Sequence, residues 1–140
     1  MNQDTLSPDE IAYLHATFET VPYAKLLGMG LGELGRGEAS VHLDVRHDLK
    51  QNRGVVHGGA IASLLDTAAA FAAVTILEPG ERVTTTDLTI HYLRPVGAGR
   101  LTARAKIIRS GRRISVLSAE VFDSNKTIVA TAVTGYIRLT

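Results

Sequence analysis

The sequence contains no cysteine, no tryptophan and few aromatic residues of any kind. The absence of cysteine excludes disulfide bonds, thiolate metal ligands and a cysteine nucleophile. Aromatic residues make up 5% of the chain and hydrophobic residues 45%, so the core has to be built mainly from Val, Leu, Ile and Ala. A chain without disulfides suits a reducing compartment, and we therefore expect a cytoplasmic protein.

The chain shows no export signal and no convincing membrane span. Its first twenty residues carry several acidic side chains and no apolar run of signal-peptide length. The segment from Gly58 to Leu77 is nearly uncharged, but Asp66 near its middle would cost about 2.5–3.5 kcal/mol on membrane insertion. We therefore interpret this segment as a buried helix and predict no membrane partner. The 140 residues suit a single domain, with residues 1–21 as a helical extension.

Positive charge is concentrated in one part of the chain. The formal net charge is only +1, which gives no reason to predict a nucleic-acid partner. Residues 94–113 nevertheless carry basic side chains and no acidic ones. This run is either the solvated face of a strand or a local anion site. Its basic members are Arg94, Arg100, Arg104, Lys106, Arg109, Arg112 and Arg113.

Hydrophobic spacing and turn residues predict a helix, two strands, one long helix and four further strands. The first helix runs from about Pro8 to Thr20, with Ser7 as its N-cap. A weak strand precedes a clear one at residues 39–45, which a polar loop connects to the long helix over residues 58–77. Tight turns separate the last four segments and predict an antiparallel meander, over residues 82–93, 100–109, 113–122 and 126–139.

The long helix determines the predicted fold class. It is apolar and rich in alanine, whereas the N-terminal helix is short and amphipathic and cannot cover it. The sheet must therefore wrap around the long helix. This arrangement is an α+β fold in which an antiparallel sheet encloses one central helix.

Two glycines begin the long helix directly after His57. The N–H groups of Gly58 and Gly59 belong to the first helical turn, where they have no intrahelical partner and lie at the positive end of the helix dipole. Such a terminus can stabilise an oxyanion, and the missing side chains let a substrate carbonyl approach. The alternative is that the glycines only permit a tight turn into the helix.

Asp66 is the only charged residue of the long helix. Burying an unpaired carboxylate is costly, so its place among leucines and alanines indicates a function, unless it faces solvent. With no cysteine, no nucleophilic serine motif and no metal-ligand spacing, the chemistry left is attack on an acyl group. The carboxylate would act either as a general base or as a nucleophile.

The spacing of these groups predicts a dimer. Asp66 follows Gly58 by eight residues, which is about 12 Å along a helix axis. One substrate carbonyl cannot easily meet both groups within one chain. If both act in one reaction, the aspartate belongs to a second subunit and the molecule has two-fold symmetry.

The segment from Asn52 to Thr67, with His57 and two glycines followed by Asp66 nine residues after the histidine, resembles the hotdog-fold thioesterases of the phenylacetate-pathway type. The strand from Thr85 to Pro95 and the basic hairpin after it are similar too. The resemblance implies a hotdog fold and hydrolysis of an acyl-CoA without a cofactor or metal. It also implies a homodimer as the active unit, usually assembled into a homotetramer.

The resemblance assigns roles to individual residues. Asp66 is implied to be the catalytic carboxylate and the Gly58 N–H the oxyanion donor. His57 is implied to orient the thioester carbonyl, and Asn52 to position the attacking water. Structural alternatives are a helix cap for the histidine and a turn residue for the asparagine. Family members also place a Ser or Thr near the carboxylate, and of the threonines at 84, 85 and 86 we favour Thr85.

Further residues are implied to bind the substrate rather than to react with it. Two of these residues are Gly59, which is next to the proposed oxyanion donor in the sequence, and Thr67, which follows the proposed catalytic carboxylate. In the basic segment they are Arg94, Arg109, Arg112 and Arg113, which suit the phosphates of coenzyme A. Two other functions stay open: an acyl-thioester hydratase or dehydratase, and an acyl-CoA sensor without catalysis.

Overall fold

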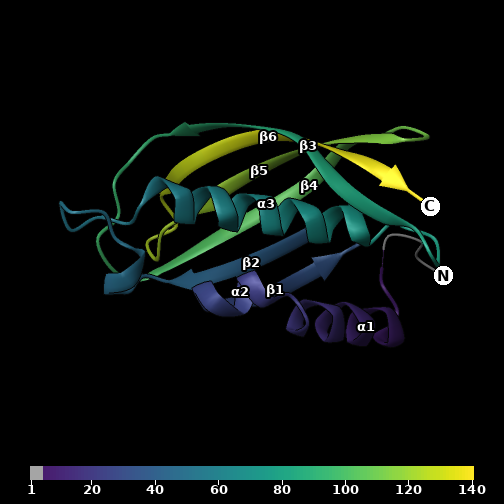
Figure 1. The fold of residues 1–140 in the computed structure, drawn as a ribbon, viewed down its shortest axis with the longest axis horizontal. Coiled ribbons are helices and arrows are strands. Elements are labelled where there is room, and N and C mark those ends of the chain that lie inside the picture. The colour runs from purple at the N-terminus through teal and green to yellow at the C-terminus, as the bar shows by residue number, and fades with distance from the viewer. Residues whose placement is uncertain (1–4) are drawn as a thin grey trace.

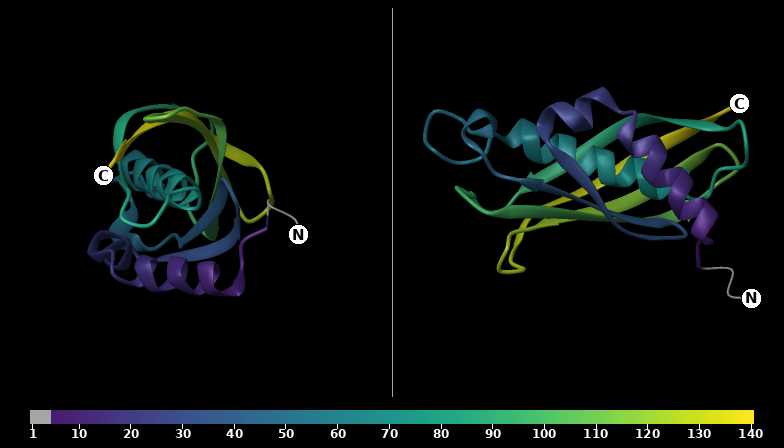
Figure 2. Two further views of the ribbon diagram at one scale, coloured as in Figure 1. Left: turned by 90° about the vertical axis from the view of Figure 1, so that its right-hand side faces the viewer. Right: turned by 90° about the horizontal axis from the view of Figure 1, so that it is seen from below.

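The computed structural model describes residues 5–140, and it has the predicted α+β architecture: an antiparallel sheet wrapped around one long helix (Figure 1). The end-on view in Figure 2 shows the sheet curving round that helix. The helices are α1 (Pro8–Glu19), α2 (Pro22–Leu27), η1 (His47–Leu49) and α3 (Gly58–Val74). The strands are β1 (Met29–Gly35), β2 (Glu38–Asp44), β3 (Arg82–Tyr92), β4 (Arg100–Ser110), β5 (Ile114–Phe122) and β6 (Ile128–Leu139).

The predicted N-terminal helix is present as α1, while the first four residues of the predicted extension lie outside the described residues. Ser7 and Glu10 form a capping box, in which each side chain accepts a hydrogen bond from the other residue's backbone N–H. Phe18 packs edge-on against Phe71 of α3, with ring centroids 5.1 Å apart. A second helix, α2, was not predicted, because its six residues are too few to display a helical period.

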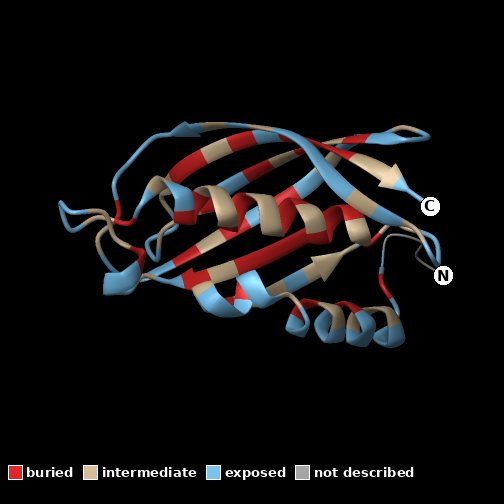
Figure 3. Cartoon of the chain, in the orientation of Figure 1, coloured by how far each residue is buried: buried red, intermediate tan, exposed pale blue. Residues whose placement is uncertain are grey.

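Helix α3 is buried because the sheet covers most of its circumference. Its leucines and most of its alanines are inaccessible to solvent, as Figure 3 shows by the buried segments along its length. The helix ends at Val74, three residues before the predicted end at Leu77. Thr75 caps it, and its hydroxyl also accepts the Gly37 N–H. Among residues 5–140, no helix has the length and apolar character needed to cross a membrane.

The predicted meander of the last four strands is wrong for β3. The sheet order is β1-β2-β4-β5-β6-β3, so β3 pairs with β6 and not with β4. Residues 93–99 carry the chain from the edge strand β3 back to β4 in the interior of the sheet. Local turn signals determine where strands begin and end, but burial of α3 from both sides determines which strands become neighbours.

Strand β3 therefore forms an edge of the sheet, and most of its residues are exposed (Figure 3). Its pairing with β6 skips one residue between Thr85 and Asp87, which is a β-bulge at Thr86. Thr85 and Tyr92 both face α3 in spite of their odd separation, since each contacts that helix.

Candidate active site

His57 caps α3, and its imidazole is part of the helix terminus. Its Nδ1 accepts the Gly59 N–H at 2.7 Å, so a neutral ring carries its proton on Nε2 and can donate it outward. The Gly59 N–H is thus already used in the helix cap. The Gly58 N–H has no partner among residues 5–140. Of the two glycines, Gly58 supplies the open donor at the positive end of the helix dipole.

Tyr92 lies directly against Gly58. Its hydroxyl donates to the Gly58 carbonyl at 3.0 Å. A side chain on Gly58 would place its Cβ only 3.3 Å from the Tyr92 ring. Beside them lies a depression of about 310 Å³, lined by Val56, Gly58, Ile61, Tyr92, Leu93, Arg94 and Pro95. An open backbone donor and an apolar hollow therefore occur together at the start of α3.

Asp66 is half-buried, and two hydroxyl groups hold its carboxylate. The Thr85 hydroxyl donates to Oδ1 at 2.9 Å. The Tyr136 hydroxyl lies 2.6 Å from the same Oδ1 and 2.7 Å from the Asp66 carbonyl oxygen. Thr85 and Tyr136 are direct partners across β3 and β6. The sheet thus presents both donors to one oxygen of the carboxylate.

Sequence reasoning did not identify Tyr136. The residue is 1% exposed, and burial together with the hydrogen bond to Asp66 raises the pKa of its phenol far above the usual range. Tyr136 therefore remains a neutral donor at any working pH. A tyrosine in the apolar run of residues 128–137 was the available signal, because a buried phenol needs a polar partner. The sequence did not indicate that Asp66 was that partner.

The other predicted residues lie in three places. Asn52 is exposed in the turn of the loop before α3, where the Gln51 N–H donates to the Val55 carbonyl. Thr67 donates its hydroxyl to the carbonyl of Ser63 within α3. Arg94 donates to the Ile128 carbonyl at the start of β6. Within the described part of the chain, none of these three side chains forms a hydrogen bond with Asp66.

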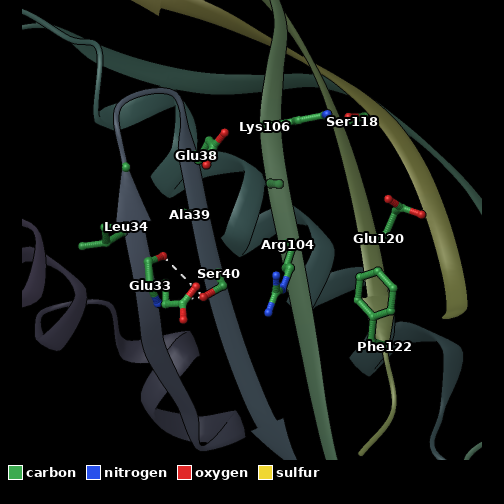
Figure 4. A pocket seen from close by; sticks show the side chains of 12 residues that line it. Glu33, Leu34, Glu38, Ala39, Ser40, Arg104, Lys106, Ser118, Glu120 and Phe122 are labelled. Carbon is green, nitrogen blue, oxygen red and sulfur yellow. Dashed lines mark hydrogen bonds between the residues drawn. The ribbon is translucent and has the colours of Figure 1, made fainter. Parts of the chain in front are cut away.

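Apart from Arg94, the basic residues of the segment fall into two groups. Arg100 pairs with Asp44 at 2.8 Å. Arg104 and Lys106 line a depression of about 330 Å³ on the sheet face that points away from α3, among acidic side chains (Figure 4). The position of these three side chains on the outer sheet face favours the solvated strand face over an anion site. Arg109, Arg112 and Arg113 instead surround the β4–β5 turn, at the end of the molecule where α3 finishes (Figure 1).

Within one chain the candidate site residues thus form two separate groups, which we call half-sites. One consists of His57, Gly58 and Tyr92 at the start of α3, and the other of Asp66 and Thr85 two turns further along. No group of three or more His, Cys, Asp or Glu side chains that could hold a metal occurs among residues 5–140.

Comparison with known proteins identifies the family. The profile of the thioesterase superfamily matches residues 53–130, which include all five residues of the two half-sites. The chain belongs to the thioesterase superfamily. Tyr136 lies on β6 beyond the matched residues. The resemblance inferred from the histidine, the two glycines and the aspartate is confirmed, and the protein is a thioester hydrolase with the hotdog fold.

Individual members of the thioesterase superfamily match most of the chain. The medium/long-chain acyl-CoA thioesterase YigI of Escherichia coli is 30% identical over 132 residues, 84% of this chain and 85% of YigI. The structure of PaaI, from the phenylacetic acid degradation operon of E. coli, is 30% identical with a TM-score of 0.89 and covers 97% of both chains. The thioesterase HI1161 of Haemophilus influenzae is 25% identical, with a TM-score of 0.87 over 99% of this chain and 94% of its own.

Proposed function

We propose that this thioesterase hydrolyses acyl-CoA to a free acid and CoA at a site shared by two subunits, in which Asp66 of one chain faces the Gly58 N–H of the other. The observation that carries the proposal is that both residues accept a hydrogen bond from a side chain of β3. Asp66 accepts a hydrogen bond from Thr85, and the Gly58 carbonyl accepts one from Tyr92. The two half-sites thus mark two points on one exposed edge strand.

A single chain cannot bring both groups to one carbonyl. The eight residues between Gly58 and Asp66 correspond to about 12 Å along α3. The reacting atoms of a bound substrate lie only about 3–3.5 Å from the groups that act on them. The missing half of each site therefore has to come from a second copy of the chain.

The register of β3 supports a specific dimer. Thr85 and Tyr92 are seven residues apart, and the bulge at Thr86 reduces this to six steps along the ladder, so that both side chains face α3. Thr89 lies halfway. A two-fold axis through Thr89 would join two β3 edges antiparallel and set Thr85 opposite the partner subunit's Tyr92. The same axis would bring Asp66 beside the partner subunit's Gly58.

The exposed edge itself favours such pairing. An open edge strand presents unpaired N–H and C=O groups, which proteins normally cover or protect. At the end of β3, Tyr92 is 52% exposed and Leu93 50% exposed in the single chain. Pairing would cover both the backbone groups and these apolar side chains. We further propose that two such dimers form the tetramer that the family resemblance implies.

The proposed chemistry uses one group from each half-site. Asp66 either removes a proton from water as the water attacks the acyl carbon, or attacks that carbon itself to form an anhydride that water then cleaves. In both cases the C–S bond breaks and CoA leaves as its thiol or thiolate. The Gly58 N–H stabilises the oxyanion. His57 donates from Nε2 to the thioester, and Asn52 positions the attacking water.

The comparisons support an acyl-CoA substrate through the names of relatives. YigI is named for medium- and long-chain acyl-CoA, and PaaI for the phenylacetic acid operon. We propose that Arg109, Arg112 and Arg113 hold the phosphates of CoA. The acyl group is aliphatic or aromatic, and we propose that it occupies the apolar hollow beside Gly58. We retain the cytoplasm as the proposed location.

The decisive experiment measures thiol release from a panel of aliphatic and aromatic acyl-CoA thioesters. We expect release by the wild-type protein and a turnover at least about a hundredfold lower for Asp66→Asn, which removes the charge but little volume. The matched control is Asp48→Asn, at an exposed aspartate of η1. Near-normal turnover by Asp66→Asn would refute the assignment. Loss of enoyl absorbance without thiol release would indicate a hydratase, and binding with neither change would indicate a sensor.

A further inference from the structure

We propose that Tyr136 is a positioning residue of the thioesterase site, which together with Thr85 occupies Oδ1 of Asp66 and leaves Oδ2 as the oxygen that acts on the substrate. This inference rests on the proposed catalytic role of Asp66. It adds a residue from β6 to a site otherwise built from α3 and β3. It also distinguishes the two oxygens of the carboxylate, which the sequence alone does not.

The geometry around Oδ1 carries the argument. Oδ1 lies 2.9 Å from the Thr85 hydroxyl and 2.6 Å from the Tyr136 hydroxyl. The second distance is in the range of charge-assisted O–H···O⁻ hydrogen bonds. Two donors on one carboxylate oxygen fix the torsion of a side chain that would otherwise rotate. Oδ2 accepts no hydrogen bond from residues 5–140, so its lone pairs are free to act on the substrate.

Tyr136 has one proton and two acceptors within reach, because its hydroxyl is also 2.7 Å from the Asp66 carbonyl oxygen. A carboxylate is the stronger acceptor, since hydrogen bonds to ionised groups are shorter and roughly twice as strong as neutral ones. The hydroxyl is therefore directed to Oδ1 while Asp66 is charged. Anchoring of the helix carbonyl alone would be a structural role, and the experiment below separates the two roles.

Among residues 5–140, no hydrogen bond or ion pair joins the Asp66 carboxylate to another charged side chain. On α3 itself Asp66 is the only charged residue. From β3 the contact is Thr85, which does not titrate, and from β6 it is Tyr136. Asp87 of β3 lies on the opposite face of the sheet, over Gly135. Removal of the Tyr136 hydroxyl should thus take one hydrogen bond from the charged form of Asp66 and leave the bond from Thr85 in place.

The test compares Tyr136→Phe with wild type across pH, using thiol release from the best acyl-CoA of the panel. We expect kcat to fall about tenfold with little change in KM, because one charge-assisted hydrogen bond is lost from a group that reacts but does not bind. We also expect the acidic limb of the kcat profile to move to higher pH, because the charged form of Asp66 loses a donor. A role limited to structure would leave that limb in place.

Ser115→Ala is the matched control. Ser115 is buried, lies directly opposite Tyr136 on β5, and its hydroxyl contacts Ser110 instead of Asp66. This variant should keep both kcat and the pH profile of wild type. Thermal unfolding of Tyr136→Phe checks that the fold is retained.

Two results would overturn the proposal separately from the proposed function. If Asp66→Asn is inactive but Tyr136→Phe keeps the wild-type kcat and acidic limb, Tyr136 does not position the carboxylate and Asp66 remains catalytic. If Tyr136→Phe loses activity with an unchanged acidic limb and a lowered unfolding midpoint, its hydroxyl serves the helix carbonyl only. If Asp66→Asn is active, the proposed function itself fails.

Discussion

Asp66 and Gly58 are both unusual residues for a buried helix, and the fold tolerates them for different structural reasons. Asp66 is accepted inside the fold because two hydroxyls satisfy one of its oxygens. Gly58 is accepted because the helix begins there, and Tyr92 leaves little room for a larger residue. Each of the two residues is therefore explained by its structural contacts as well as by its proposed chemical role.

Replacing Gly58 by alanine tests whether close approach to its backbone is required. The new Cβ would lie 3.3 Å from the Tyr92 ring, so the ring has to shift by a few tenths of an ångström. We expect turnover to fall about tenfold or more, because the added methyl group obstructs a carbonyl approaching the N–H. Stability should change little, since alanine is a better helix former than glycine.

The double variant Gly58→Ala with Tyr92→Leu serves as its control. It makes room for the methyl group without restoring access to the backbone. Recovery of wild-type turnover in the double variant would mean that the displaced ring, and not the blocked N–H, caused the loss.

Among the helices and strands, β3 is the element on which the proposed site depends most. It carries Thr85 near one end and Tyr92 at the other, and its bulge turns both towards α3. The exposed edge that results from its pairing with β6 is the surface through which the proposed dimer would form.

A charge at Thr89 tests the proposed pairing of two β3 edges. Thr89 is exposed in the single chain, and the proposed axis sets it opposite its own copy. Thr89→Asp should weaken the dimer and lower the specific activity, because like charges directly opposite each other in a sheet are unfavourable. Light scattering after size-exclusion chromatography, combined with the thiol assay over a dilution series, measures both effects.

Thr89→Asn is the neutral control of nearly the same size and should remain dimeric. High salt should partly restore the aspartate variant. A Thr89→Asp protein that keeps its mass and its activity at every dilution would exclude this interface.

At the scale of the whole molecule, the basic residues of positions 100–113 are divided between the outer sheet face and the β4–β5 turn. On the outer face, Arg100 is paired with Asp44, and Arg104 stands opposite Glu120 in the β4–β5 register. Arg112 and Arg113 lie at the turn, exposed, at the end of the molecule where α3 finishes. We therefore assign the proposed contacts with the phosphates of CoA to the second group only.

Neutralising Arg112 and Arg113 together by glutamine should raise KM for acyl-CoA about two- to fivefold, with kcat nearly unchanged. Exposed ion pairs contribute little each and are screened by salt, so the effect should shrink at high ionic strength. It should disappear for an acyl-pantetheine substrate, which lacks the nucleotide phosphates. Michaelis–Menten kinetics with both substrates at two salt concentrations provide the measurement.

Arg104→Gln, in the same segment but on the outer sheet face, is the matched control and should leave both constants unchanged. An equal rise in KM for both substrates would show that the two turn arginines support the fold rather than bind phosphates.

Local patterns in the sequence were sufficient to predict most elements and the family. Helical spacing, the N-cap at Ser7 and the turn residues located most helices and strands to within a few residues, because these signals are local. The run from His57 to Asp66 identified the family, since its residues are close in the chain and their spacing forms a motif. Helix α2 was missed because so short a helix has no period to detect.

Which distant residues meet depends instead on how the whole chain folds. The position of β3 beside β6 follows from enclosing α3 on both sides, and no turn signal encodes it. That position sets Thr85 and Tyr136 on one rung and directs both hydroxyls to Asp66. It also leaves β3 as an open edge. Contacts between residues as far apart as Asp66 and Tyr136 depend on sheet order and register, which arise from burial of the whole core rather than from any local pattern.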